Sequence, residues 1–255
     1  MSDHAEHHGV HVPDHWETSP WPLTVSLGIF ALCWAFMFQF VYSAGMAAVI
    51  ALAIGTILVA MSVIGWVGET VGKADFGFSP VAMLLYILTE AMIFLAFFVA
   101  YWRMKLQAGA AAWPPEGTPE ITAGMQFVAL GLLFIGSFAA HKADAKYKTE
   151  PESTGGLLLV PVIVGAVFLV LVYSELAGMA AQGFTIGTNA FGTTVFGLGG
   201  WHAAHILVGM VMYLLIALST MKGNTSRSYS SSAAIYWDFC TVVHFFVVMQ
   251  VYVWK

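Results

Sequence analysis

The chain has 255 residues, of which 59% are hydrophobic and only 9% are charged. Soluble domains carry roughly a quarter of charged residues, so this composition excludes an ordinary water-soluble protein. It indicates an integral membrane protein. The formal net charge of −5 offers no basic surface, so we expect no nucleic-acid partner. Cys33 and Cys240 both lie in apolar runs, which argues against a disulfide framework and a thiol-based metal site.

Residues 1–21 form a polar tail without Lys or Arg and without the apolar segment of a cleavable signal peptide. The tail is rich in histidine, with His4, His7, His8, His11 and His15. Such a tract can bind transition metals weakly. We favour a solvated, flexible terminus, and metal binding by the tail stays open.

Seven mainly apolar stretches of about 20 residues or more are long enough to cross a bilayer. They lie at 22–43, 46–68, 79–103, 121–142, 156–181, 192–220 and 232–254. A proline stands near the start of the first and third stretches, and a serine-rich run at 223–232 separates the last two. The sequence therefore predicts an all-α bundle of seven transmembrane helices. Its parts are the tail (1–21), helices one and two (22–68), and helices three to seven (79–254).

The distribution of basic residues predicts the orientation. Six lie in the loops on the N-terminal side, and these are Lys73, Lys142, Lys146, Lys148, Lys222 and Arg227. Three lie on the other side, and these are Arg103, Lys105 and Lys255. The bias predicts an N-terminus in the cytoplasm and a C-terminus on the opposite side.

Six ionisable residues lie deep inside the predicted spans: Glu90, Glu175, His202, His205, Asp238 and His244. Ionisable groups at membrane depth are expensive and mark candidate functional sites. At 1.5 Å per residue, Glu90, His244 and His205 lie about 17, 18 and 22 Å from the cytoplasmic ends of their helices. We therefore expect these three to meet near the middle of the membrane, where a Glu–His hydrogen bond would offset desolvation.

Three interpretations of Glu90 stay open at this point. It is a protonated or hydrogen-bonded link between helices, a member of a proton path, or a metal ligand. His202 and His205 are three residues apart and share a helix face, as in some metal or haem sites. A zinc site needs a third protein ligand, and no matching pair is evident elsewhere, so we favour packed histidines and expect no metal.

The residues show no nucleophile–base pair, phosphate-binding loop or zinc-protease signature, so we expect no catalytic residue and no redox centre on this chain. A transporter and a scaffold subunit of a larger complex are the two classes of membrane protein that remain.

Five stretches then resemble one family in order and shape. They are SPWPLT (19–24), TEAMIFLAFFVAYW (89–102), WPPEG (113–117), GFTIGTNAFGTTVF with GGWHAAHILVG (183–209), and AAIYWDFCTVVHFFVVMQVYVW (233–254). Together they resemble subunit III of cytochrome c oxidase, a member of the haem–copper oxidases.

The resemblance implies a subunit without haem or copper that packs beside the catalytic subunit I, near subunit II and possible small subunits. Subunit I reduces oxygen to water and pumps protons. Subunit III of this family is thought to support proton uptake and to protect the enzyme during turnover. Helices one and two splay from the other five to form a V-shaped cleft that holds phospholipid. Trp66 and Glu69 fall where the family contacts lipid headgroups.

The resemblance also assigns residues. Glu90, after Thr89, matches the family's buried carboxylate, which is reactive toward carbodiimides, and Glu175 matches a second Ser-Glu pair. The last helix departs from the family pattern, because Asp238 replaces a His and His244 replaces a Trp. We therefore expect a divergent bacterial branch in which His244 takes over part of the network around Glu90. On this hypothesis His244→Phe lowers the stability of the complex or the reactivity of Glu90.

The sequence thus predicts a non-catalytic subunit III of an aa3-type oxidase in the bacterial inner membrane, with haem and copper in partner subunits. Subunit III of a quinol oxidase and an accessory subunit of nitric oxide reductase are alternatives within this fold. A stand-alone proton-coupled transporter that uses Glu90 and the histidines is an alternative of another class.

Overall fold

The computed structural model describes residues 19–70, 79–109, 112–147, 149–223 and 227–255. Within these ranges seven helices are long and apolar enough to cross a membrane, and there is no strand. This confirms the prediction of an all-α protein with seven transmembrane helices. The chain divides into two compact units, Met1–Phe76 and Gly77–Lys255, and each is described by itself. The V-shaped cleft between them stays a prediction.

The first unit is a pair of packed helices, α1 (Trp21–Phe40) and α2 (Gly45–Thr70). A Cβ atom added to Gly28 would lie 2.8 Å from the Val59 side chain and 3.1 Å from the Gly55 carbonyl oxygen. The two backbones therefore touch at this point, as small residues allow in membrane helices. The Ser62 hydroxyl donates a 2.7 Å hydrogen bond to Thr24, which adds a polar link between the two helices.

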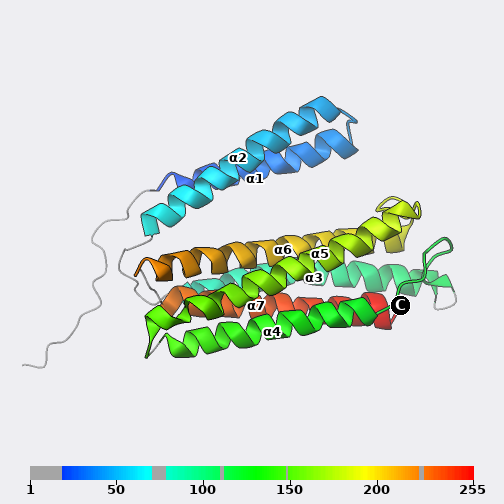
Figure 1. Cartoon of the computed structure of the whole chain (residues 1–255). Coiled ribbons are helices and arrows are strands. Elements are labelled where there is room, and N and C mark those ends of the chain that lie inside the picture. The colour runs from blue at the N-terminus through cyan, green and yellow to red at the C-terminus, as the bar shows by residue number, and fades with distance from the viewer. Residues whose placement is uncertain (1–18, 71–78, 110–111, 148, 224–226) are drawn as a thin grey trace, which may run out of the picture. The chain divides into compact units, whose positions relative to one another are not determined.

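The second unit contains α3 (Ser79–Ala108), α4 (Gly124–Lys146), α5 (Gly155–Ala181), α6 (Ala190–Met221) and α7 (Arg227–Val247). A short 3-10 helix, η2 (Pro151–Thr154), precedes α5, and a π-helical segment, η3 (Val248–Val253), continues α7. Helices α4, α5, α6 and α7 pack in a ring in which α7 closes back onto α4. Helix α3 packs on the side formed by α6 and α7 (Figure 1).

The centre of the ring is filled by Trp237 of α7, which is fully buried. Three glycines surround its indole: Gly136 of α4, Gly165 of α5 and Gly209 of α6. A Cβ atom at these positions would lie 2.6, 3.1 and 3.2 Å from the nearest indole atom. The indole N–H donates a 3.0 Å hydrogen bond to the Leu133 carbonyl, so its one polar group is satisfied. One large side chain thus contacts all three other helices of the ring.

The helix boundaries depart from the predicted ones where polar residues join a helix. Helix α3 continues past residue 103 to Ala108, because Lys105 is favourable near a helix C-terminus, and it ends before Gly109, whose φ is +80°. Helix α4 begins and ends a few residues later than predicted. The serine-rich run at 223–232 was predicted to separate the last two helices, but residues 227–232 of this run belong to α7. Ser230 and Ser232 are buried there, and Ser232 donates to the Ser228 carbonyl.

The loop that carries the WPPEG motif is fixed by packing. Trp113 is buried, and its ring lies edge-on to Tyr101 and Phe191 at 5.4 and 5.8 Å. Its indole N–H donates a 3.2 Å hydrogen bond to the Tyr101 hydroxyl. At the start of α6, the Asn189 side chain accepts from the Gly192 amide and donates to Thr118 of the same loop. These motif residues therefore hold the loop against α3 and α6.

The glycine contacts around Trp237 predict a sharp stability difference within one helix. Gly136→Ala places a methyl group against an indole that cannot move, and we expect a loss of about 1–3 kcal/mol in the free energy of unfolding. Gly131→Ala on the same helix is the control, because its Cβ atom meets nothing within 4 Å. Unfolding by heat or detergent, followed by tryptophan fluorescence, measures both variants. Equal stability of the two would contradict the packing described for Trp237.

Candidate functional site

The first buried polar group joins Glu90 of α3 to His205 of α6. The His205 Nε2 lies 3.1 Å from the Glu90 Oε2, and the two side chains are 8% and 13% exposed. The rings of Phe94 and Trp201 lie against His205, with centroid separations of 4.9 and 5.4 Å. The structure thus brings together two of the three residues that we expected to meet near the middle of the membrane.

The hydrogen bonds of His205 define how many protons the pair holds. Its Nδ1 lies 2.8 Å from the Trp201 carbonyl oxygen, which only accepts, so Nδ1 carries a hydrogen. The link between Nε2 and Glu90 then holds one proton, either on the carboxyl group or on the imidazole. Both forms of the pair have zero net charge, which is the arrangement that a low-dielectric environment favours.

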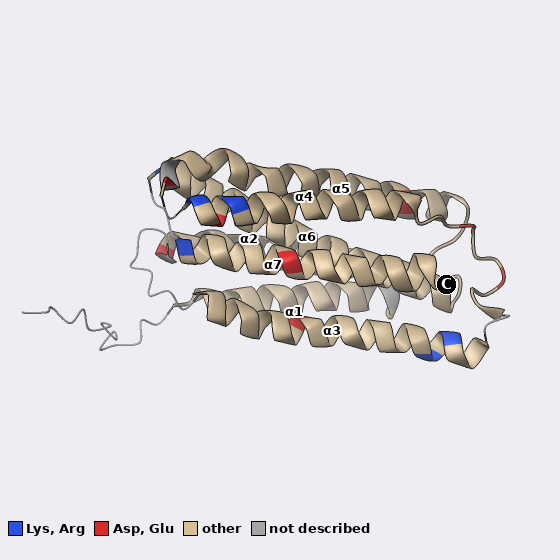
Figure 2. Cartoon of the chain, turned by 90° about the horizontal axis from the view of Figure 1, so that it is seen from below, with Lys and Arg blue, Asp and Glu red and all other residues tan. Residues whose placement is uncertain are grey.

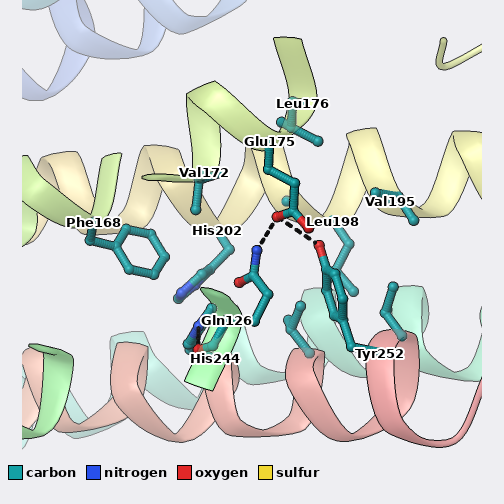
Figure 3. Close-up of a pocket in the computed structure, with 13 residues that line it drawn as sticks. Gln126, Phe168, Val172, Glu175, Leu176, Val195, Leu198, His202, His244 and Tyr252 are labelled. Carbon is teal, nitrogen blue, oxygen red and sulfur yellow. Dashed lines mark hydrogen bonds between the residues drawn. The ribbon is translucent and has the colours of Figure 1, made fainter. Parts of the chain in front are cut away.

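A second polar cluster lies on Glu175 of α5. The Gln126 amide from α4 and the Tyr252 hydroxyl from η3 both donate to the same carboxylate oxygen, the latter at 3.2 Å (Figure 3). The π-helical turn of η3 carries Tyr252, which is buried. Donors from two other elements, α4 and η3, therefore meet at one half-buried carboxyl group.

His202 of α6 and His244 of α7 adjoin this cluster and stack on one another (Figure 3). Their ring centroids are 5.2 Å apart, the rings are within 14° of parallel, and both side chains are buried. Phe168 of α5 lies edge-on to both rings. The His244 Nε2 donates to the Gln126 carbonyl oxygen at 3.3 Å, which ties the stacked pair to the helix that carries the Glu175 donor.

The position of His244 corrects the hypothesis that it takes over part of the network around Glu90. Its ring contacts are His202, Phe168 and the Gln126 carbonyl, whereas Glu90 pairs with His205. The depth estimate placed Glu90 and His244 at a similar height along their helices. It gave no information on the direction in which each side chain points.

Asp238 of α7 lies in a third group, which we call the α4–α7 patch: Ser137, His141, Asp238 and Thr241. The Ser137 hydroxyl donates to Asp238 Oδ1 at 2.8 Å, and His141 Nε2 lies 2.7 Å from Asp238 Oδ2. The His141 and Asp238 side chains are 59% and 40% exposed, so this group is on the surface of the second unit. Asp238 was predicted as part of a buried network, and the structure shows it half-exposed.

The remaining predicted residues have simpler positions. Trp66 and Glu69 lie three residues apart near the end of α2, so they share a helix face. The five histidines of the N-terminal tail lie outside the described residues. In the described parts of the chain, no three His, Cys, Asp or Glu side chains come close enough to hold a metal ion. Most Lys and Arg residues of the second unit lie near the ends of its helices (Figure 2).

The sequence interpretation missed five residues of these groups: Gln126, Ser137, His141, Thr241 and Tyr252. A search for ionisable residues deep in a span passes over an amide, a hydroxyl and a phenol. His141 stands beside Lys142, at a predicted helix end, and was not counted as deep. Polar residues of every kind within an apolar run would have been the better signal.

The geometry around Glu90 predicts how its labelling by an apolar carbodiimide responds to substitution. Carbodiimides attack the protonated carboxyl group, and His205 competes for that proton. In His205→Phe the buried carboxyl keeps its proton, so we expect several-fold more label, measured by mass spectrometry of the Glu90 peptide. His244→Phe is the control and leaves the labelling unchanged, because His244 belongs to the other cluster. A change in the control alone would contradict this assignment.

Comparisons with known proteins identify the family of the chain. The family described as cytochrome c oxidase subunit III matches residues 8–255 of the chain. The chain is 28% identical over 273 residues to cytochrome c oxidase subunit 3 of Marchantia polymorpha, with 98% of each protein covered. It is 26% identical to the subunit 3 of Drosophila melanogaster over 100% of the chain and 99% of the relative. For Lumbricus terrestris the identity is 28%, over 93% and 96%.

The match runs through both units. The chain belongs to the cytochrome c oxidase subunit III family.

Proposed function

We propose that the chain is the non-catalytic subunit III of an aa3-type cytochrome c oxidase, which reduces oxygen to water in aerobic respiration. The observation that carries the proposal is the match to this family over residues 8–255, at nearly the full length of its relatives. On this proposal the haem and copper centres belong to the partner subunits. This chain supplies packing, lipid contacts and buried groups that carry protons.

The main partner is subunit I, and the α4–α7 patch supports a contact with it. Asp238 lies 11 residues after the start of α7, or about 17 Å along the helix, so it lies within the apolar span. Charged groups at such depth rarely face lipid. Phe134 and Phe138 of α4 and Val242 of α7 are exposed within one helical turn of the patch, so the surface around it is apolar.

The chemistry of the patch defines what the partner offers. In either net-neutral form of the His141–Asp238 pair, the second ring nitrogen, His141 Nδ1, carries a hydrogen. It therefore donates, and the partner helix offers an acceptor such as a carbonyl, a hydroxyl or a carboxylate. We propose that a transmembrane helix of subunit I covers the patch in this way, with subunit II and any small subunits elsewhere.

Two further roles follow from the family. Phospholipid binds near Trp66 and Glu69, where an aromatic ring and a carboxylate share one face at the end of α2. The buried groups Glu90, His202, His205, His244 and Glu175 support proton uptake. The support for this role is that Glu90 Oε2 and His205 Nε2 lie 3.1 Å apart inside the second unit, within hydrogen-bond distance.

The proposed location is the bacterial inner membrane, with a cytoplasmic N-terminus and a periplasmic C-terminus. The support is the excess of Lys and Arg on the N-terminal side of the spans. Lys142 and Lys146 stand in the last two turns of α4, on that side, and Arg103 and Lys105 stand near the end of α3, on the other.

The proposal is tested by purifying the tagged chain from its host in mild detergent and recording a reduced-minus-oxidised spectrum. We expect haem a bands in a fixed ratio to the chain. Haem b and o bands without haem a would instead assign the chain to a quinol oxidase. A colourless, monodisperse chain would overturn the subunit assignment, and proton flux in vesicles that contain this chain alone would then favour a transporter.

The contact with subunit I predicts a loss of assembly when the patch is changed. Asp238→Leu leaves His141 without its partner, and we expect a several-fold lower ratio of haem to tagged chain. The double variant His141→Phe with Asp238→Leu removes both charges, which is often neutral for the fold of a chain. We expect it to fold and still to lose haem. Full haem recovery in the double variant would show that the patch is not an interface.

A further inference from the structure

A small cavity lies within the second unit, between the stacked histidines and Glu175. Its volume is about 20 Å³, and its walls come from α4, α5, α6, α7 and η3. The polar residues at its walls are Gln126, Glu175, His202, His244 and Tyr252 (Figure 3). The other walls are aliphatic or aromatic side chains and the backbone of Gly199.

Three buried ring nitrogens at this cavity have no hydrogen-bond partner in the protein: His202 Nδ1, His202 Nε2 and His244 Nδ1. The His244 Nε2 donates to the Gln126 carbonyl, so the Nδ1 of the neutral ring is an acceptor. A neutral His202 presents one donor and one acceptor. The unpaired set therefore consists of two acceptors and one donor.

Buried polar atoms are rarely left without a partner, because each unmade hydrogen bond is expensive away from water. The two nitrogens of His202 lie on different edges of its ring, so one small molecule reaches only one of them. A molecule that bridges the two rings bonds to one nitrogen of His202 and to His244 Nδ1. Water meets this condition, since it is small and makes two to four hydrogen bonds. A cavity of about 20 Å³ exceeds the roughly 10–15 Å³ that one water molecule requires.

We propose that this cavity is a binding site for one water molecule, which is hydrogen-bonded to the imidazoles of His202 and His244. The inference concerns atoms of this chain alone and does not rest on the oxidase assignment. The bound water adds a hydrogen-bonded link between the two stacked imidazoles. His244 Nε2 already donates to the backbone carbonyl of Gln126, whose side chain donates to Glu175. With this water in place, a proton can pass between His202 and His244, so the two histidines have a chemical role besides packing.

The titratable groups around the site come from several elements. They are Glu175 on α5, His202 and His205 on α6, His244 on α7 and Tyr252 on η3. Helix α4 contributes the amide of Gln126, and α3 contributes the apolar ring of Phe94 beside His202. No Lys or Arg is among the residues that line the cavity, so its only possible cations are the imidazoles themselves.

Two glycines of α6 offer a matched test. Gly199 lines the cavity, and a Cβ atom there would lie 3.9 Å from Leu176, which also lines it. Gly199→Ala therefore fills part of the cavity without a clash and leaves both histidines in place. Gly200→Ala is the control, because its Cβ atom meets nothing within 4 Å and the residue does not line the cavity. Both changes replace Gly by Ala in the same helix.

The measurement is a map of the native complex at a resolution that shows water molecules, for the wild type and both variants. We expect one peak within about 2.7–3.2 Å of a ring nitrogen of His202 and of His244. The peak persists in Gly200→Ala and is lost in Gly199→Ala. An infrared band of the internal water that shifts in H₂¹⁸O provides a second readout and follows the same pattern.

Three outcomes would overturn the proposal. The first is a wild-type cavity without a peak. The second is a peak at about 2.0–2.1 Å from the ring nitrogens, which is the distance of a metal ion such as zinc. The third is a peak that keeps its full height in Gly199→Ala, which would place the water outside this cavity.

Discussion

The packing of Trp237 is the constraint on which the second unit depends. One fully buried indole fills the space left by glycines on α4, α5 and α6, and its N–H is satisfied by a backbone carbonyl. Lipid tails are as apolar as the helix surfaces, so the hydrophobic effect does little to drive these helices together. Close packing between the helices provides the attraction instead. Such packing requires that large and small residues alternate where the helices touch. The polar groups described here depend on this packing, because it sets the spacing of the helices that carry them.

The polar groups of the second unit follow one physical rule. A charge inside a membrane is tolerated when a partner of opposite charge or a shared proton leaves no net charge. Glu90 with His205 and Asp238 with His141 both meet this condition, one pair in the interior and one at the surface. Glu175 instead accepts hydrogen bonds from two neutral donors, the Gln126 amide and the Tyr252 hydroxyl. The three carboxyl groups therefore have different environments.

The sequence predicted the helices well because length and hydropathy are enough to define a membrane span. It failed at the serine-rich start of α7, where burial against neighbouring helices overrides a weak local preference for loops. It identified Glu90 and His205 as partners from their depth alone. It assigned His244 to the same group, because depth does not define rotation about the helix axis. The partners Gln126 and Tyr252 are neutral, so a search for charge did not find them.

Phe94 of α3 lies between the two interior groups. Its ring contacts His202 of one group and His205 of the other, with centroid separations of 6.2 and 4.9 Å. A phenyl ring has no hydrogen-bonding atoms, so Phe94 cannot be part of a hydrogen-bonded chain between His202 and His205. Electrostatic interactions act across the ring of Phe94, so a positive charge on His205 disfavours a positive charge on His202. The two groups are thus neighbours whose charges affect one another, and no hydrogen bond described here joins them.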